Sequence, residues 1–176
     1  FVPDVDRVRA YDDRALPIAA GQTISQPYVV AVMCEALALD GDERVLEVGT
    51  GSGYAAAVLA ELAGRVFTIE RHRALADAAR ERLAAEGAAN VTVRCGDGSR
   101  GWPEQAPFDG IVVAAGVPTV PPALERQLAV GGRMVIPVGP HPEDLELVCL
   151  TREGPDRLRT QRLFGVRFVP LVAGTA

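Results

Sequence analysis

Lysine is absent from this chain of 176 residues, in which all 18 basic residues are arginines. Without a lysine amine the chain cannot form a Schiff base, so pyridoxal-phosphate chemistry and related imine chemistry are excluded. The 23 acidic residues outnumber the arginines and give a net charge of −5. Affinity for nucleic acid depends on clustered positive charge, and this balance therefore predicts that nucleic acid is not a partner.

Nucleophiles and metal ligands are also scarce. The chain has two histidines and three serines, and none of the serines lies in a G-x-S-x-G elbow. Its cysteines, Cys34, Cys95 and Cys149, are far apart in sequence and odd in number, which predicts neither a disulfide framework nor a zinc motif. We expect no metal ion, and three apolar thiols in a reducing compartment.

Long apolar runs are missing as well. No stretch approaches the roughly 18 consecutive apolar residues of a membrane helix. A content of 48% hydrophobic and 23% charged residues is typical of a globular domain. At this length one domain is expected to bury its own core. We predict a monomeric, cytoplasmic protein without a membrane partner.

The most informative stretch that is present is R-V-L-E-V-G-T-G-S-G-Y, Arg44 to Tyr54. It predicts a short buried strand and then a turn in which every second residue is glycine. Glycine tolerates positive φ and has no Cβ, so backbone N–H groups can approach a ligand at the following helix. The dinucleotide fingerprint G-x-G-x-x-G would need glycine in place of Tyr54. The spacing G-x-G-x-G after Glu47 instead indicates S-adenosylmethionine, with a purely structural turn as the alternative.

Two acids after later strands extend this prediction. Glu70 closes a second apolar strand, 65–69, and is placed to hold ribose hydroxyls, the alternative being a surface acid at a strand end. Asp97, beside Gly98, follows a third strand, 91–95, and is placed to bond an adenine amino group, the alternative being a plain turn aspartate. Ligands of open α/β sheets bind at the carboxyl ends of the strands, so these acids are expected to meet the glycine turn.

Strands and helices alternate from residue 44 onward. The pattern predicts strands at 44–48, 65–69, 91–95, 108–114 and 133–138, and helices at 53–63 and 72–86. A third helix is predicted before the last of these strands and ends at about 128. Such alternation indicates parallel strands joined by right-handed crossovers. Two further strands, at 145–151 and 158–171, predict a hairpin at the edge of the sheet.

The flanking regions complete the plan of one domain. The N-terminal part, 1–43, combines an irregular polar lead-in with a helix at 27–39, for which Ser25 is a good cap. The part 44–139 is the predicted cofactor-binding core, and 140–176 holds the C-terminal strands and the substrate edge. We predict an α/β, Rossmann-like S-adenosylmethionine methyltransferase fold: a mostly parallel central sheet flanked by helices, with antiparallel C-terminal strands.

Several motifs resemble those of the protein-L-isoaspartate (D-aspartate) O-methyltransferase family. They are A-A-G-Q-T-I-S-Q-P at 19–27, F-D-G-I-V-V-A-A-G at 108–116, V-P-P-A-L-E-R-Q-L at 120–128, G-G-R-M-V-I-P-V-G at 131–139 and G-V-R-F-V-P-L at 165–171. The first and the last are the most specific. The resemblance implies methyl transfer from S-adenosylmethionine to the α-carboxyl of L-isoaspartyl residues in damaged proteins and peptides, with S-adenosylhomocysteine as product.

The resemblance also implies residue roles. Ser25 matches the family's active-site serine, whose hydroxyl would orient the substrate carboxylate. The cofactor would be held by Thr23, Ile24, Gln26, Tyr28, Glu47, Gly49, Thr50, Gly51, Ser52, Gly53, Glu70, Arg71, Asp97 and Gly98. An exposed strand for backbone pairing with an extended isoaspartyl peptide would be formed by Val166, Arg167, Phe168, Val169, Pro170 and Leu171.

Two departures from the family and two rival functions accompany this interpretation. The family has a further N-terminal helical segment before the place of Phe1, which we expect to be missing here. Some members have a hydroxyl that touches the cofactor where this chain has Val172. One rival function is methylation of normal aspartyl residues in a ribosomal peptide. The other is a cofactor-binding module without catalysis.

Overall fold

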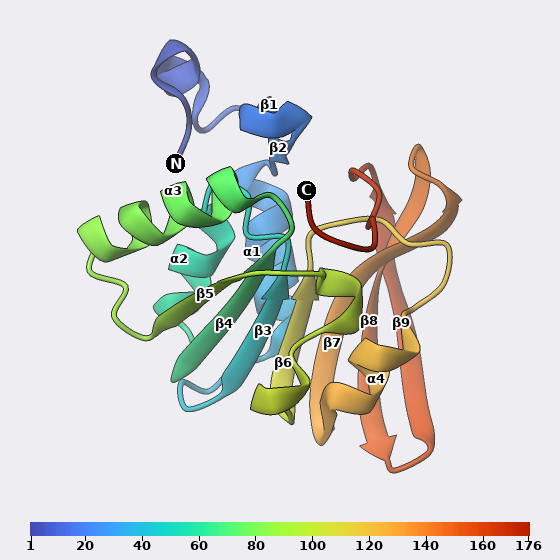
Figure 1. Ribbon diagram of the computed structural model, residues 1–176. Helices are drawn as coiled ribbons and strands as arrows, with labels where there is room; N and C mark the ends of the chain where they lie inside the picture. The colour runs from blue at the N-terminus through green and yellow to red at the C-terminus, as the bar shows by residue number, and fades with distance from the viewer.

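The computed structural model describes residues 1 to 176 and is built around a seven-stranded sheet (Figure 1). In spatial order its strands are β5 (Val91–Cys95), β4 (Arg65–Glu70), β3 (Arg44–Val48), β6 (Phe108–Val113), β7 (Leu128–His141), β8 (Asp144–Gly154) and β9 (Arg157–Val166). Neighbours from β5 to β7 pair in parallel, whereas β8 and β9 are antiparallel. The predicted α/β fold with antiparallel C-terminal strands is confirmed.

The order of the strands reverses beside β3. The chain runs from β3 outward through β4 to β5, and then returns to the other side of β3 to form β6. Crossovers therefore leave the carboxyl ends of β3 and β6 in opposite directions, and a crevice opens between them. The glycine turn, which follows β3 directly, lies at this crevice.

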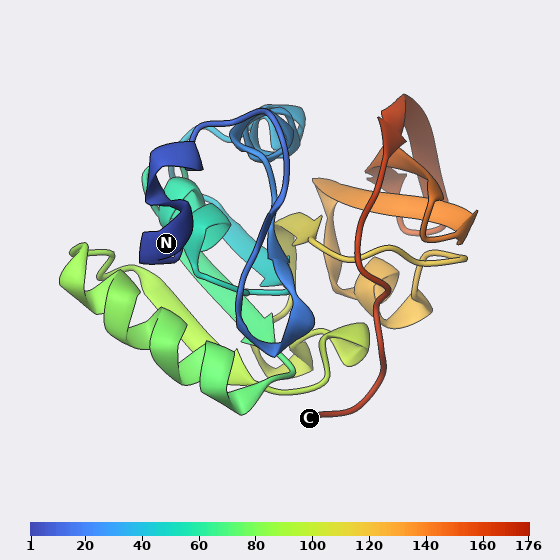
Figure 2. The same cartoon turned by 90° about the horizontal axis from the view of Figure 1, so that it is seen from above.

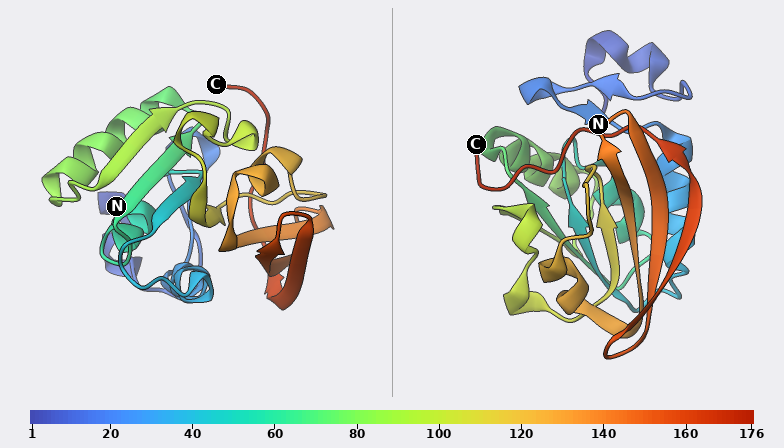
Figure 3. Two further views of the ribbon diagram at one scale, coloured as in Figure 1. Left: turned by 90° about the horizontal axis from the view of Figure 1, so that it is seen from below. Right: turned by 90° about the vertical axis from the view of Figure 1, so that its right-hand side faces the viewer.

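Helices cover both faces of the sheet, because its central strands are apolar on both sides. One face carries α1 (Pro27–Leu37) and α2 (Tyr54–Ala60), with α3 (Arg73–Ala85) beside α2. The other face carries α4 (Pro122–Gln127) and Trp102. Within β3 the residues alternate between the two cores, Val45 with α1 and Leu46 with Phe67. Figure 3 shows α3 and the β8–β9 hairpin at opposite ends of the sheet.

The N-terminal lead-in is more ordered than predicted. It contains a 3₁₀-helix at Asp4–Arg9 and a small hairpin in which β1 (Leu16–Pro17) pairs with β2 (Thr23–Ile24). The hairpin turns through a short 3₁₀ segment, Ala19–Gly21, and buries Leu16. Figure 1 shows this hairpin above the sheet, on the side of the carboxyl ends of the parallel strands.

Two local predictions are corrected. Ser25 does not cap α1: Gln26 is the N-cap residue and no side chain makes a capping hydrogen bond there. The helix begins at Pro27, a first position at which the missing N–H of proline costs no hydrogen bond. The last strand ends at Val166 rather than at 171, because the chain leaves β8 there and makes an isolated parallel bridge from Pro170 to Gly116.

The C-terminal residues run across the top of the sheet. Beyond Pro170 the chain reaches the end of β4, where Ala176 N–H donates to Arg71 O at 3.0 Å and Arg71 Nε donates to Gly174 O at 3.4 Å. Figure 2 shows this segment on the opposite side of the crevice from the N-terminal hairpin. The N-terminal hairpin and the C-terminal segment thus both cover the carboxyl ends of the parallel strands. No helix is both long and apolar enough to span a membrane.

Candidate functional site

The turn after β3 has the backbone that its glycines allow. Gly49, Gly51 and Gly53 have φ of 98°, 53° and 89°, all in the region that L side chains rarely adopt. The turn is tied to the neighbouring strand, because Gly49 N–H donates to Ile69 O at 2.8 Å. A Cβ on Gly49 would lie 3.4 Å from the Ala114 methyl group, so the turn is also in contact with the end of β6. Its position between two strands is therefore fixed by backbone contacts.

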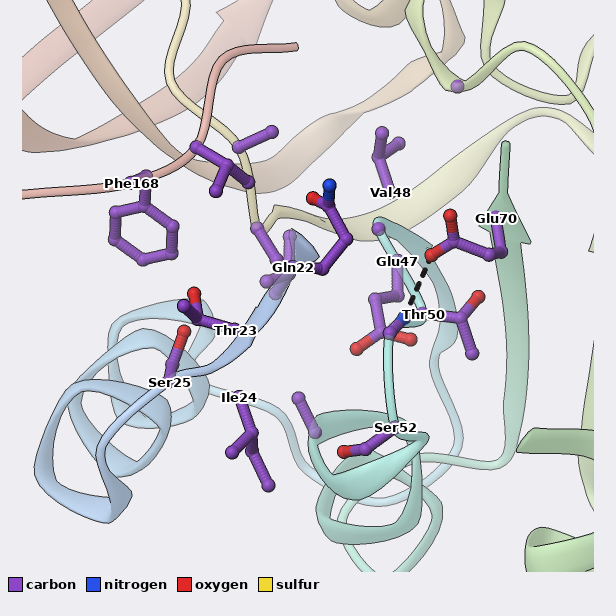
Figure 4. Close-up of a pocket in the computed structure, with 18 of the residues that line it drawn as sticks. Gln22, Thr23, Ile24, Ser25, Glu47, Val48, Thr50, Ser52, Glu70 and Phe168 are labelled. Atoms are coloured by element: carbon purple, nitrogen blue, oxygen red, sulfur yellow. Dashed lines mark hydrogen bonds between the residues drawn. The ribbon is translucent and has the colours of Figure 1, made fainter. Parts of the chain in front are cut away.

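Glu70 anchors the same turn from the end of β4. Its side chain is only 5% exposed. Oε2 accepts from Gly51 N–H and Oε1 accepts from His72 N–H, both at 2.9 Å (Figure 4). A carboxylate oxygen has more than one lone pair, so each can still accept a hydroxyl. The surface-acid alternative does not apply to a buried side chain, and Glu70 faces the crevice as expected.

A second acid, Glu47, is completely buried inside β3. Its Oε2 accepts from Thr68 Oγ1 at 2.5 Å, and Thr68 Oγ1 also lies 2.5 Å from Thr50 Oγ1. The other carboxyl oxygen, Oε1, has no partner. Burial raises the pKa of Glu47 to about 8; the Thr68 hydrogen bond opposes this, and the charge of Glu70 adds to it. Burial thus favours the protonated form of this acid.

Asp97 and Gly98 form the third part of the crevice. Asp97 caps a short 3₁₀ turn, accepting from Ser99 N–H at 3.0 Å and Ser99 Oγ at 2.6 Å. Burial raises the pKa of Asp97, but these bonds and the backbone of Gly174 outweigh it and hold the pKa below its usual value. At Gly98 a Cβ would lie 2.5 Å from Val48 Cγ1, so only glycine lets this loop lie flat against β3.

One cavity joins the glycine turn to the two terminal segments. Figure 4 shows Ser25 and Phe168 at one end of it and Glu70 at the other. Of the residues predicted for the site, those that line the cavity are Thr23, Ile24, Ser25, Glu47, Gly49, Thr50, Gly51, Ser52, Glu70, Arg71, Gly98, Phe168, Val169, Pro170 and Leu171. Val172, at the place of the absent hydroxyl, lines it as well.

The remaining predicted residues lie outside this cavity. Gln26 turns away and donates from Nε2 to Asp13 Oδ1 at 2.8 Å. Tyr28 is 58% exposed and packs against Phe164 of the β8–β9 hairpin. Gly53 packs against α3, and Asp97 borders a neighbouring polar hollow. Val166 and Arg167 do not reach the cavity.

Sequence reasoning missed much of the apolar wall. The face of α1 contributes Val30, Met33 and Cys34, and α2 contributes Tyr54 and Leu59. Helical spacing of apolar residues predicts only a core-facing stripe, and most of these side chains do belong to the core beneath the turn. The sequence contained no signal to separate the two uses. Thr68 was missed because no motif includes it.

The model of the family described as Protein-L-isoaspartate(D-aspartate) O-methyltransferase matches residues 1–176. The chain belongs to this family. It is 62% identical over 172 residues to Protein-L-isoaspartate O-methyltransferase 1 of Rhodopseudomonas palustris strain HaA2, covering 98% of this chain and 70% of the relative. It is also 62% identical to the enzyme so named from Methylorubrum populi, over 99% of this chain and 81% of the relative.

Solved structures of the family share the fold. A protein-L-isoaspartate O-methyltransferase superposes with a TM-score of 0.84 at 31% identity, over 97% of this chain and 55% of that one. A Plasmodium falciparum protein, named for the same activity and in complex with S-adenosyl-L-homocysteine, has a TM-score of 0.75 at 26% identity, over 92% of this chain and 81% of that one. The predicted family, enzyme class and methyl donor are confirmed.

The first test concerns the backbone of the turn. Gly49→Ala places a Cβ at positive φ, which costs on the order of 1–2 kcal/mol, and brings it against Ala114. Gly87→Ala is the matched control, because its φ is also positive, at 78°, and nothing lies within 4 Å. We expect both variants to lose stability in urea unfolding, and only Gly49→Ala to weaken S-adenosylhomocysteine binding by about tenfold or more in calorimetry. Equal binding by the two variants would contradict the assignment.

The second test concerns Glu70. Glu70→Ala removes the acceptor of Gly51 N–H and the acceptor predicted for the ribose hydroxyls, and we expect donor binding to weaken by about 1–3 kcal/mol. Glu81→Ala, on the exposed face of α3, is the control that removes a carboxylate elsewhere. An unchanged dissociation constant in Glu70→Ala would remove this residue from the binding site.

Proposed function

We propose that this chain methylates the α-carboxyl of L-isoaspartyl residues in damaged proteins and peptides, and that the cavity between the glycine turn and Ser25 is where it does so. The observation that supports the proposal is the single cavity shared by the turn, Glu70, the segment 22–25 and the segment 168–172. The first two features suit a nucleoside with hydroxyls, and the last two suit a peptide. The ester then cyclises to a succinimide, which reopens in part as normal aspartate.

The residues of the crevice fit S-adenosylmethionine. Glu70 offers acceptors to ribose, and Val48 and Gly98 line the cavity on the side where we expect the adenine ring. The fully buried Glu47 also lines the cavity, with one carboxyl oxygen unpaired. When bound, S-adenosylmethionine supplies a methyl group made electrophilic by its sulfonium. The chain's own task is to hold the accepting oxygen and to keep water out.

The substrate needs no general base. A carboxylic acid with a pKa near 4 is already ionised at pH 7, so its oxygen is the nucleophile as it arrives. Neither His72 nor His141 lines the cavity, and none is required. Ser25 makes no capping bond, and its place at the end of the cavity opposite Glu70 suits an O–H donated to the substrate carboxylate. Such a bond fixes the direction from which the carboxylate approaches.

The segment after β9 has one edge left for a peptide. Gly116 N–H donates to Val169 O and Leu171 N–H donates to Gly116 O, both at 2.8 Å. Alternate residues of an extended chain point to opposite sides, so the N–H and C=O of Phe168 face away from this bridge, and neither has a backbone partner. Backbone pairing there would hold an extended substrate while tolerating varied side chains. A monomeric state and a cytoplasmic location remain predictions.

A pair of peptides tests the substrate class. The two differ only in carrying L-isoaspartate or normal aspartate at one position, and transfer of labelled methyl groups from S-adenosylmethionine is counted. We expect methylation of the isoaspartyl peptide alone, because only there is the α-carboxyl free. In the normal peptide the α-carboxyl is part of the peptide bond and the free carboxylate is the β one. Methylation confined to the normal peptide would support the ribosomal-peptide alternative. Donor binding without turnover on either peptide would support the inactive module.

The variant Ser25→Ala tests the serine. Loss of a hydrogen bond to a charged group costs about 1.5–3 kcal/mol, so kcat is expected to fall by roughly tenfold to a hundredfold. The calorimetric dissociation constant of S-adenosylhomocysteine should stay within about twofold, because the hydroxyl acts on the substrate side. Thr160→Ala, an exposed hydroxyl on β9, is the control. Full turnover in Ser25→Ala would show that the hydroxyl does not touch the substrate.

A further inference from the structure

Glu47 is the most unusual side chain in the protein. It is 0% exposed in the central strand of the sheet, yet only one of its two carboxyl oxygens has a hydrogen-bond partner. An ionised carboxylate in such a place would lose its hydration without replacement. The unpaired oxygen therefore calls either for a proton on the acid or for a partner that is not part of the free chain.

No positive charge of the chain is available to it. The ionisable groups that face Glu47 are Cys34 on α1 and Glu70 on β4, with Tyr54 of α2 close to Cys34. β6 presents only the apolar Val112 on this side. None of the arginines forms an ion pair with this acid. Burial, and secondarily Glu47 itself, raise the pKa of Cys34 to about 12, so this thiol stays neutral too.

The acid nevertheless faces the cavity. Glu47 is one of the residues that line it, and Figure 4 shows its carboxyl group between Thr50 of the glycine turn and Ile24 of the N-terminal hairpin. A cation placed in the cavity beside Glu47 would complete the missing interaction. S-adenosylmethionine carries two positive centres, its sulfonium and its α-ammonium group.

We propose that Glu47 is a neutral acid in the free protein and becomes a carboxylate when the cationic methyl donor binds, so that donor binding releases a proton to solvent, with Thr68 as the positioning residue. No covalent bond of the donor changes in this step: the proton leaves the carboxyl group, and the negative charge left behind pairs with the donor. The inference rests on the proposed function only for the identity of the ligand.

Thr68 fits the positioning role through its single hydroxyl proton. Its Oγ1 lies 2.5 Å from Glu47 Oε2 and 2.5 Å from Thr50 Oγ1, and all three side chains are at most 4% exposed. When Glu47 is neutral, it can donate to Thr68, which then donates to Thr50. When Glu47 is ionised, both hydroxyls turn round and Thr68 donates to the carboxylate. The chain of hydroxyls thus links the charge of the acid to the glycine turn.

Calorimetry measures the released proton directly. S-adenosylmethionine is titrated into the protein at pH 7 in phosphate and in Tris, whose heats of ionisation differ. The difference in apparent enthalpy is expected to correspond to about one proton released per site, since the pKa of Glu47 is about 8. Glu47→Gln keeps the shape and cannot ionise, so its difference should vanish apart from the ligand's own amino group. Titration of S-adenosylhomocysteine, which lacks the sulfonium, shows which positive centre pairs with Glu47. Proton release with both ligands identifies the α-ammonium group. Proton release with S-adenosylmethionine alone identifies the sulfonium.

Variants of Thr68 supply a second readout. Thr68→Val removes the hydrogen bond that favours the ionised form of Glu47, so the pKa of this acid should rise further. The donor affinity of the variant should still increase with pH, but it should level off at a higher pH than in the wild type. Thr68→Ser restores the hydroxyl and is expected to restore the wild-type profile. A residue that merely packs would lower the affinity by one factor at every pH.

Two results would overturn the inference: a wild-type dissociation constant that does not change between pH 6 and 9, or equal proton release by the wild type and Glu47→Gln. Either can occur with full isoaspartyl methylation, which separates this failure from a failure of the proposed function.

Discussion

The positive φ angles of the turn after β3 are the constraint on which the rest of the site depends. They let the backbone lie in contact with β4 on one side and β6 on the other, with Gly49 N–H bonded to Ile69 O at 2.8 Å and Ala114 N–H bonded to Val48 O at 2.8 Å. Because strand order reverses between β3 and β6, no crossover covers this position, and it stays open at the top of the sheet. The terminal segments then close it from two sides, so each half of the site is placed by reference to one rigid turn.

The parallel core was predictable because its signals are local. Each strand of the core is a short apolar run between glycines or polar turns, and the length and flanking residues of such runs favour strands buried on both faces. The terminal regions depend instead on contacts between distant residues. Leu16 and Ile24 form a hairpin because both can bury beneath the lead-in, and the end of β9 is fixed by a bridge from Pro170 to Gly116. No periodicity within either segment encodes these pairings, which is why the hairpin was missed and the last strand was drawn too long.

In the candidate site, too, local motifs predict some residues correctly, whereas others depend on the three-dimensional fold. Motifs supplied Gly51, Ser25 and Glu70, and these residues meet in one cavity. They failed for Gln26 and Tyr28, which are neighbours of Ser25 in sequence but point elsewhere once α1 begins at Pro27. Spacing within a motif therefore overstates the site wherever a helix starts inside it.

The two carboxyl groups of this chemistry have opposite requirements, and the cavity separates them by depth. The substrate carboxylate must be charged to act as a nucleophile, and we propose that it meets Ser25 at the end of the cavity formed by the terminal segments. Glu47, at the bottom of the crevice, is kept uncharged by burial until a cation arrives. A free site therefore holds no negative charge from Glu47 to repel the substrate. In a loaded site that charge is paired with one positive centre of the donor, which leaves the other positive centre to attract the substrate carboxylate. A strand residue that takes no part in bond formation would in this way keep a site without lysine or histidine selective for an anionic nucleophile.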